Sequence, residues 1–463
     1  MKTEVFEKSV RLPVSAEQAF AWHERPGALE RLIPPWETVE VVDRAGEGVK
    51  PGSRVRLRSR CGPVFLNWEA EHGDYEAGRR FTDVARRGPF AAWTHAHEFE
   101  SLPAGGGSLL RDRVEYALPG GVIGRSLLGA WTRRRLDALF AYRHATTRED
   151  LRFARDRGPV RPRRILISGA SGLIGSTLLP FLRTRGHEVR RLVRGQAREA
   201  DAVAWNPRSG RIDAAAAGEI DVVIHLAGAG IADARWTAER RREIRESRVD
   251  ATRALAESLA ALPRPPRVVI GGSAIGFYGD GGEAWIDETS DGGDGFLAGL
   301  CRDWEAAWSP LDGAGTRRVY LRTGVVLSPR GGALAKMLPP FRLGAGGRVG
   351  DGHQWWSWIS VDDMVGAIGH AIEVDTLRGP VNAVSPAPAT SASFAKTLGR
   401  VLGRPALLPA PAWALRLALG RGLADEALLA SQRVRPSALA ATGYRFRHEN
   451  LEAALRHVLG RFC

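Results

Sequence analysis

The sequence predicts two folded parts: a smaller α+β domain, followed by an α/β domain built on a doubly wound parallel sheet. Two observations predict the larger part. A short apolar strand at 164–168 leads through a glycine-rich turn into a helix, and strand and helix patterns then alternate to about residue 400. A third observation separates the parts, because residues 153–163 are charged, contain two prolines and lack an apolar period.

These patterns set the expected domain boundaries. We expect a first domain over 1–152, a basic linker over 153–163 and the α/β domain over 164–400. No apolar run reaches the roughly eighteen residues of a membrane helix. The opening MKTEVFEKSV contains acids where a signal peptide is basic and then apolar. The sequence therefore predicts a cytoplasmic protein without a membrane span.

The net charge of +14 and the three cysteines exclude several functions. The positive charge comes mainly from arginines, many of them in the linker and around 190–198, and no module that interleaves aromatic and basic residues accompanies them. This indicates a solvated linker and a local phosphate site, not nucleic-acid binding. Cys61, Cys301 and Cys463 lie far apart without paired spacing, which predicts neither a disulfide framework nor a zinc site.

The glycine-rich turn after the strand at 164–168 is the strongest local signal. It opens a helix that we expect to run to Arg185, with Gly186 as its stop. Glycine suits such a turn because the backbone must approach a pyrophosphate closely and the helix must pack near the strand, while the helix N-terminus offers free N–H groups to the anion. The unit predicts a Rossmann-type domain that binds a dinucleotide through Gly169, Ser171, Gly172, Leu173, Ile174 and Gly175.

Arg194 indicates which dinucleotide. It follows the second expected strand, 187–193, where an NAD site places a carboxylate for the ribose 2′-OH, and no acid occurs before Glu199. An arginine here can pair with the 2′-phosphate of NADP, so NADP(H) is the expected cofactor and NAD is less favoured. The alternative is that Arg194 is one more surface arginine. A further strand at 221–228 ends in small residues that would let the sheet edge lie against the cofactor: Leu226, Ala227 and Gly228.

The order of the later motifs is specific. GASGLIG, HLAG, SRVDATRAL, GSAIGFYG and FLAGLCRDWEAAW, followed by the segment from LRTGVVLSPRGG to VSPAP, are similar to the extended short-chain dehydrogenase/reductase superfamily. Within it, the chain resembles the nucleoside-diphosphate-sugar epimerase-like proteins over residues 164 to 460. The resemblance implies NAD(P) binding, a small-molecule substrate and a helical C-terminal segment over 401–463.

The chain departs from this superfamily at the catalytic position. Its enzymes use a Tyr-x-x-x-Lys pair, in which lysine lowers the pKa of the tyrosine that exchanges a proton during hydride transfer. Residues 295–301 read GFLAGLC here, and Arg248 stands where the family has a supporting asparagine. The catalytic residues are therefore unknown. Ser273, which is also expected at the cofactor, and Tyr278 remain as weak candidates.

Three further side chains have both functional and structural interpretations. His353 lies among tryptophans and could donate a proton or simply pack. Asp362 could also donate a proton, or it could cap the following helix together with Asp363. Arg322 ends a strand and could hold a phosphate or form a structural ion pair.

The first domain shows an order of elements typical of a sheet closed by one long helix. We expect a strand at 4–12, short helices at 16–22 and 26–32, strands at 53–58, 65–72 and 93–99, and a long helix at 123–143. The broad apolar face of that helix would pack on the sheet through Leu127, Leu128, Trp131, Leu136, Leu139 and Phe140.

This order, with RPGALERLIPPW and GPFAAWTHAHEFE in it, resembles the polyketide cyclase/START-like (SRPBCC) helix-grip superfamily. The resemblance implies an apolar ligand between sheet and helix. Six aromatic residues would either line or fill that space: Trp36, Phe65, Trp68, Phe90, Trp93 and Phe99. His95 and His97 alternate along a strand and share a face, but no third ligand is apparent, so the sequence predicts no metal site.

Two functions of different classes remain open. The chain could be an NADP-dependent epimerase or oxidoreductase whose first domain handles an apolar substrate. It could instead be a non-enzymatic NADP-binding sensor or scaffold that has lost the Tyr/Lys pair. The sequence does not predict the substrate, the oligomeric state or the biological process.

Overall fold

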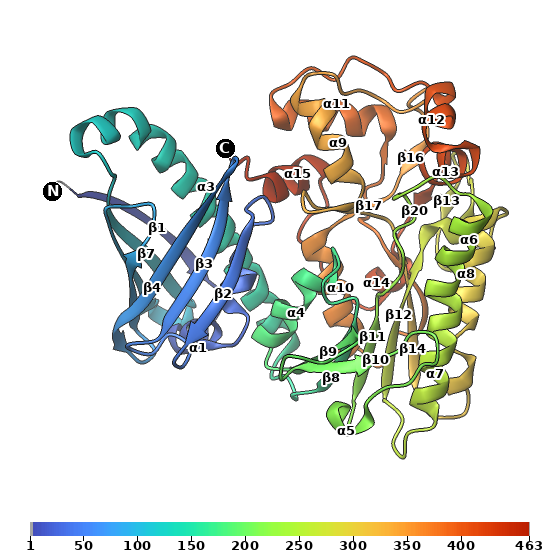
Figure 1. Cartoon of the computed structure of the whole chain (residues 1–463), viewed down its shortest axis with the longest axis horizontal. Coiled ribbons are helices and arrows are strands. Elements are labelled where there is room, and N and C mark those ends of the chain that lie inside the picture. The colour runs from blue at the N-terminus through green and yellow to red at the C-terminus, as the bar shows by residue number, and fades with distance from the viewer. Residues whose placement is uncertain (1–2, 463) are drawn as a thin grey trace. The chain divides into compact units, whose positions relative to one another are not determined.

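The computed structural model describes residues 3–462 and divides into two compact units. The first contains the chain up to Arg161, together with Pro180–Gly186 and the residues from Leu459 onward. The second contains Pro162–Leu179 and His187–Val458. Each has its own sheet, as Figure 1 shows.

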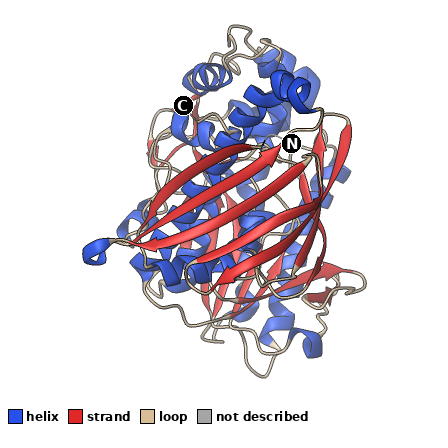
Figure 2. Ribbon diagram, turned by 90° about the vertical axis from the view of Figure 1, so that its left-hand side faces the viewer, coloured by secondary structure: helices blue, strands red, loops and turns tan. Residues whose placement is uncertain are grey.

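The first unit is built on an antiparallel sheet of seven strands, seen broadside in Figure 2. Its order is β1-β7-β6-β5-β4-β3-β2, with every neighbouring pair antiparallel. The strands expected at 4–12, 53–58, 65–72 and 93–99 are confirmed within a longer set: β1 (Glu4–Leu12), β2 (Val39–Ala45), β3 (Arg54–Cys61), β4 (Val64–Glu76), β5 (Arg80–Arg87), β6 (Ala92–Ser101) and β7 (Ser108–Ala117).

Three α-helices accompany this sheet: α1 (Ala16–Glu24), α2 (Ala28–Arg31) and α3 (Gly121–Arg157). Helix α1 begins at a capping box, in which Ser15 and Gln18 satisfy each other's backbone N–H groups. Helix α3 has 37 residues and ends at Gly158, whose φ is +71°. It is longer than the predicted helix at 123–143 and includes five residues of the expected linker, because no helix-breaking residue occurs before Gly158.

The prediction of an apolar face that packs on the sheet is confirmed only for Leu136 and the residues of α3 that follow it. Leu136 and Phe140 are buried against Phe6 and Val114 of the sheet. Leu127, with 76% exposure, and its neighbours Leu128 and Trp131 are instead exposed. A helix of 37 residues is about 55 Å long, whereas a ten-residue strand spans about 33 Å, so α3 is longer than the sheet on which it packs.

The aromatic residues of the first unit mostly fill its interior. Trp93 and Phe99 are buried, and Phe99 packs edge-on against Phe20. Trp68, Phe90 and Trp93 form a second cluster. Phe65 was expected at the interior, but it is exposed because its position in β4 faces solvent.

The second unit confirms the doubly wound parallel sheet, in the order β10-β9-β8-β11-β12-β14-β18. All six pairs of neighbours are parallel. The chain order reverses between β8 and β11, where sheets of this kind bind ligands at the carboxyl ends of the strands. The strands are β8 (Arg164–Ser168), β9 (Glu188–Arg194), β10 (Ala202–Trp205), β11 (Val222–His225), β12 (Val268–Ala274), β14 (Arg317–Thr323) and β18 (Gly379–Ala383).

Helices connect these strands and extend into a helical C-terminal segment. The α-helices are α4 (Gly175–Thr184), α5 (Ala214–Ala217), α6 (Ala238–Arg245), α7 (Ala251–Ala260), α8 (Phe296–Ala306), α9 (Gly332–Arg342), α10 (Val361–Glu373), α11 (Ser391–Leu402), α12 (Ala412–Leu419), α13 (Arg421–Ala424), α14 (Ser437–Ala441) and α15 (Leu451–Leu459). Three small strand pairs complete the unit: β13 (Trp285–Ile286) with β20 (Arg433–Val434), β15 (Val325–Leu327) with β17 (Trp358–Ser360), and β16 (Trp355–Trp356) with β19 (Ala389–Thr390).

Helix α10 corrects one expectation, because its N-cap is Ser360 and not the Asp362–Asp363 pair. Ser360 accepts a hydrogen bond from the backbone N–H of Asp363. The Asp363 carboxylate is buried and accepts from the backbone N–H groups of Arg447 and His448, while Asp362 contacts His457. Both aspartates therefore hold the C-terminal segment. Across residues 3–462, no helix combines the length and hydropathy needed to cross a bilayer.

Candidate functional site

The turn between β8 and α4 can close only with glycine at two positions. Gly169 has a φ of +75°, and a Cβ atom there would lie 2.9 Å from the backbone nitrogen of Ala227. A Cβ on Gly175 would lie 2.1 Å from the carbonyl oxygen of Gly169. The turn therefore packs directly on itself and on Leu226 and Ala227, which follow the end of β11.

The same turn presents backbone donors to solvent. Gly172 N–H bonds the carbonyl of Gly169, and Ser176 N–H bonds that of Gly172. The N–H groups of Leu173 and Ile174 have no hydrogen-bond partner within residues 3–462. Ser171 and Gly172 are exposed at the tip. Free N–H groups at the start of a helix can bind an anion, and the binding of a pyrophosphate at this turn stays a prediction.

Arg194 lies in a surface pocket of about 540 Å³ at the carboxyl ends of β9 and β10. Arg208 and Arg211 line the same pocket, and none of the three guanidiniums forms an ion pair with another described residue. One carboxylate, that of Asp213, also lines it and caps α5 by accepting from the N–H of Ala216. The pocket is therefore positively charged and open to a phosphate group.

Arg248 is a buried cation without an anion. It lies in a π-helical turn, Glu246–Asp250, that interrupts the helix between α6 and α7, and it is only 7% exposed. Its Nη1 donates to the carbonyl of Ile244 at 3.4 Å, and its guanidinium lies 5.2 Å from the ring centre of Trp304. Its Nε has no partner, and burial lowers the pKa of the guanidinium to about 10. π-Helical turns are frequent at functional sites.

Arg248 also explains one residue of the expected cofactor edge. A Cβ on Gly228 would lie 3.1 Å from the Cζ atom of Arg248. The small residue after β11 therefore makes room for this guanidinium as well as for any ligand.

Ser273 and Tyr278 belong to a buried polar network. Ser273 donates to Glu305 of α8 at 2.7 Å, and Glu305 forms a bidentate ion pair with Arg322 at 2.9 Å for each bond. Arg322 also donates to the Tyr278 hydroxyl at 3.0 Å, and this hydroxyl donates to Asn382 at 2.7 Å. Arg322 therefore forms the structural ion pair that was one of its two predicted roles. Glu305 lies in the motif FLAGLCRDWEAAW and Asn382 in the segment that ends in VSPAP, but neither residue was predicted to belong to the site.

The pKa of Tyr278 is unsuited to a catalytic tyrosinate. Burial raises it, and the hydrogen bonds from Arg322 and to Asn382 oppose that rise only in part. Helix α8, where the superfamily's Tyr/Lys pair was expected, presents Phe296, Leu297, Leu300 and Cys301. Cys301 is a buried free thiol whose pKa burial raises to about 11. Cys463 lies outside the described residues.

His353 is apart from this network. Its side chain is exposed, and its backbone N–H bonds the carboxylate of Asp351. It therefore does not pack among Trp355, Trp356 and Trp358 in the way that one of its predicted roles required.

The fold and the glycine turn define the class of the second unit: a Rossmann-type dinucleotide-binding domain of the short-chain dehydrogenase/reductase kind, with an altered catalytic helix. Three family models match the chain. The NAD dependent epimerase/dehydratase family matches residues 165–382, the polyketide cyclase/dehydrase and lipid transport family matches 12–140, and a domain of unknown function matches 410–458.

Curated relatives match about two thirds of the chain. An epimerase family protein of Mycobacterium bovis is 43% identical over 297 residues, which cover 64% of this chain and 98% of the relative. The human epimerase family protein SDR39U1 is 39% identical over 304 residues, covering 64% and 99%. The chain belongs to this epimerase family, and a domain of the polyketide cyclase type precedes the family's domain.

Two solved structures are similar. A nucleoside-diphosphate sugar epimerase from Corynebacterium glutamicum is 35% identical with a TM-score of 0.79, and the match covers 98% of this chain and 90% of that one. Human SDR39U1, solved with NADPH, is 38% identical with a TM-score of 0.60, covering 64% and 99%.

Proposed function

We propose that the second unit binds NADP(H), with the pyrophosphate against the Gly169–Gly175 turn and the 2′-phosphate beside Arg194. The pocket at the ends of β9 and β10 carries this proposal, because it gathers three guanidiniums without ion-pair partners where the ribose of a dinucleotide lies in this fold. A 2′-phosphate would receive charge-assisted hydrogen bonds there. The NADPH bound to human SDR39U1 supports the same cofactor.

The test is a titration of NADP+ and NAD+ against the wild type and Arg194→Ala. A charge-assisted hydrogen bond contributes about 1.5 to 3 kcal/mol, so Arg194→Ala should weaken NADP+ binding about tenfold or more and leave NAD+ binding nearly unchanged. Arg198→Ala is the matched control, since Arg198 is an exposed arginine on the next loop that does not line the pocket. Equal losses for both cofactors would refute the role of Arg194.

We propose epimerase or oxidoreductase chemistry at this cofactor as the first candidate activity, with no tyrosinate on α8. A non-enzymatic NADP-binding sensor or scaffold is the second candidate. It is favoured by one observation: the hydroxyls of Ser273 and Tyr278 both donate to partners within the protein, and the segment of α8 where the Tyr/Lys pair was expected, 296–301, contains only apolar residues and a buried thiol.

Deuterium transfer distinguishes the two candidates. The protein is loaded with NADPH deuterated at C4 and incubated with a small-molecule extract, and mass spectrometry follows the label. Deuterium that appears in a metabolite with the wild type, and does not appear with Gly175→Val, supports the enzyme. NADPH that binds tightly but keeps its label throughout supports the sensor or scaffold.

For the first unit we propose an apolar small-molecule ligand between the sheet and α3. The match to a family described by lipid transport supports this. The full chain is melted with a long-chain fatty acid or a polycyclic aromatic compound, and a bound ligand should raise the first unit's melting temperature by mass action. Phe99→Ala should change that shift, whereas the exposed Phe65→Ala should not. No shift with either compound class, and no co-purifying ligand by mass spectrometry, would contradict the proposal.

A further inference from the structure

The interior of the first unit contains a cluster of histidine and aspartate side chains on three adjacent strands. His95 and His97 lie on β6, and strand pairing places Asp83 of β5 directly opposite His95 and Asp112 of β7 directly opposite His97. His95 and Asp112 are each 2% exposed, and His97 is 9% exposed. Because side chains alternate along a strand, these residues all occupy the sheet face that α3 covers.

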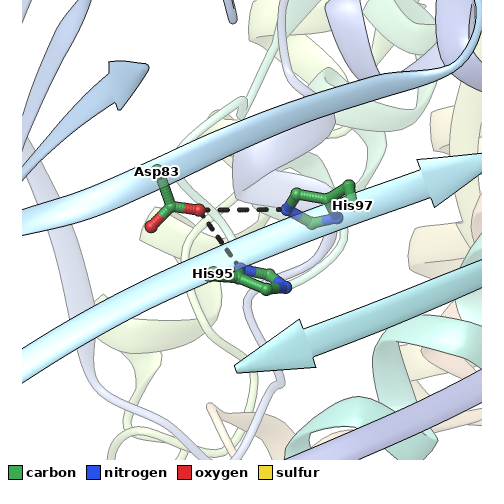
Figure 3. Close-up of side chains that lie close together, drawn as sticks. All are labelled: Asp83, His95 and His97. Carbon is green, nitrogen blue, oxygen red and sulfur yellow. Dashed lines mark ion pairs between the residues drawn. The ribbon is translucent and has the colours of Figure 1, made fainter. Parts of the chain in front are cut away.

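Three atoms of this cluster converge. The Oδ2 atom of Asp83 lies 3.1 Å from Nδ1 of His95 and 3.9 Å from Nε2 of His97, as the dashed lines in Figure 3 mark. One ligating atom from each of the three residues lies within 4.8 Å of the other two. Ligands at about 2.0–2.2 Å from a tetrahedral ion are about 3.4 Å apart, so the set needs only small side-chain rotations to close around a metal.

The second ring nitrogens of both histidines face a second carboxylate, that of Asp112. Nε2 of His95 hydrogen-bonds Oδ1 of Asp112 at 3.1 Å, and Nδ1 of His97 lies 2.6 Å from the same oxygen. The other oxygen of Asp112 is 2.6 Å from Nε2 of His144 on α3. When His95 donates this hydrogen bond from Nε2, the lone pair of its Nδ1 is left facing Asp83. Nδ1 of His97 lies close to the same Asp112 oxygen without forming a hydrogen bond, and a small rotation of the ring would let it donate there and turn the lone pair of Nε2 to Asp83. Metal-binding histidines usually donate their other N–H to a carboxylate in this way.

The charges of the cluster also suit a cation. Asp83 and Asp112 bring two carboxylates next to the imidazoles of His95 and His97 in the interior of the first unit, and a buried carboxylate needs a counter-charge, which a protonated imidazole or a metal ion can supply. Two imidazoles and one carboxylate suit a transition metal better than Mg²⁺ or Ca²⁺, which prefer oxygen ligands. Three protein ligands also leave a coordination position for water or a ligand oxygen.

We propose that Asp83, His95 and His97 bind one divalent transition-metal ion, with Asp112 as the residue that positions both histidines. The proposal is independent of the dinucleotide site, since all four residues belong to the first unit.

The first experiment measures zinc binding to the full chain. Protein treated with a chelator and dialysed is titrated with ZnCl₂ by calorimetry, in competition with a weak chelator. One equivalent should bind, and Asp83→Asn and His97→Gln should each weaken it at least tenfold. The control is His23→Gln. His23 is another buried histidine of this unit and bonds the carbonyl of Ala19, so its replacement should leave the bound equivalent unchanged. Circular dichroism establishes that each variant is folded.

The second experiment uses Co²⁺, whose visible absorption reports the ligand set. The wild type and His23→Gln should give the same band, and Asp83→Asn should lose it. Asp112→Asn should keep one equivalent but bind it about 10- to 100-fold more weakly, as expected for a residue that orients ligands. The proposal is overturned if the wild type binds no equivalent of Zn²⁺ or Co²⁺. It is equally overturned if the folded Asp83→Asn and His97→Gln variants bind as the wild type does, since the ion would then lie elsewhere.

Discussion

The two units build their candidate sites in opposite ways. In the second unit, the dinucleotide turn is one continuous segment of backbone between β8 and α4, and its function depends on glycines and N–H groups. In the first unit, the histidine and aspartate cluster consists of side chains from three strands that meet only through strand pairing. The residues of a contiguous backbone site have a fixed spacing in the sequence. Residues that meet only because their strands pair in one register have no such spacing.

The largest expected effect is that of Gly175→Val, which should nearly abolish dinucleotide binding and leave the histidine and aspartate cluster unchanged. In Gly175→Val, the side chain would collide with the Gly169 carbonyl and displace the turn. The phosphates would lose at least two charge-assisted hydrogen bonds of about 1.5 kcal/mol or more each, so NADP+ affinity should fall by more than about 100-fold. Fluorescence titration with NADPH measures the loss.

Two controls sharpen this prediction. Gly299→Ala should bind NADPH as the wild type does, because a Cβ there meets nothing closer than 3.9 Å. Zinc binding by Gly175→Val should also equal that of the wild type. If NADPH binding survives in Gly175→Val, the turn is not the pyrophosphate site.

The same contrast explains what could be predicted from the sequence. The glycine turn and the alternating strands follow local patterns, so the doubly wound sheet could be predicted from them. The roles of the turn and of Arg194 at the cofactor stay predictions. Asp83 carries no such signal, because it meets His95 only through the pairing of β5 with β6. From the sequence, His95 and His97 could be placed on one face of a strand, but no metal site was predicted because Asp83 could not be placed beside them.

Local sequence patterns also could not predict which polar side chains of the second unit are buried or what they bond. The sequence identified Arg248 as a replacement for the family's asparagine, but not that it would be buried without a carboxylate. Tyr278 and Ser273 could be named as hydroxyl groups of the right kind. Their engagement by Asn382 and Glu305 depends on contacts between residues far apart in the chain.

A second prediction tests the unequal halves of α3. Phe140 is fully buried, and Phe140→Ala should lower the free energy of unfolding of the first unit by about 3 to 5 kcal/mol through loss of packing. Leu127→Ala should change it by less than about 0.5 kcal/mol, because that side chain is exposed. Chemical denaturation followed by circular dichroism measures both, and NADPH binding should be unchanged in both. A cost for Leu127→Ala as large as that for Phe140→Ala would mean that the first turns of α3 are covered in solution.

The last prediction expects almost no effect from replacing the buried Arg248, and the other buried arginine of the second unit, Arg322, supplies the comparison. Arg322 is 4% exposed and paired with Glu305, so Glu305→Gln leaves a buried charge without its partner and should cost about 3 to 5 kcal/mol. Arg248→Met should change stability by less than about 1 kcal/mol, although Arg248 is almost as buried. Its contact with Trp304 contributes about 0.5 to 2 kcal/mol, and the cost of burying an unpaired cation offsets this.

The pH dependence of Arg248 has a definite sign. Its pKa is lowered to about 10 in the folded chain, from 12.5, so the unfolded chain binds this proton more tightly. The cost of the buried charge is therefore fully present below pH 10 and is relieved as the pH rises from about 10 towards 12.5. At pH 7 to 9, denaturation of Arg248→Met and the wild type should give nearly equal midpoints, with Glu305→Gln well below both. A loss in Arg248→Met that equals the loss in Glu305→Gln would show that the Arg248 guanidinium has an anionic partner in solution and is not an unpaired charge.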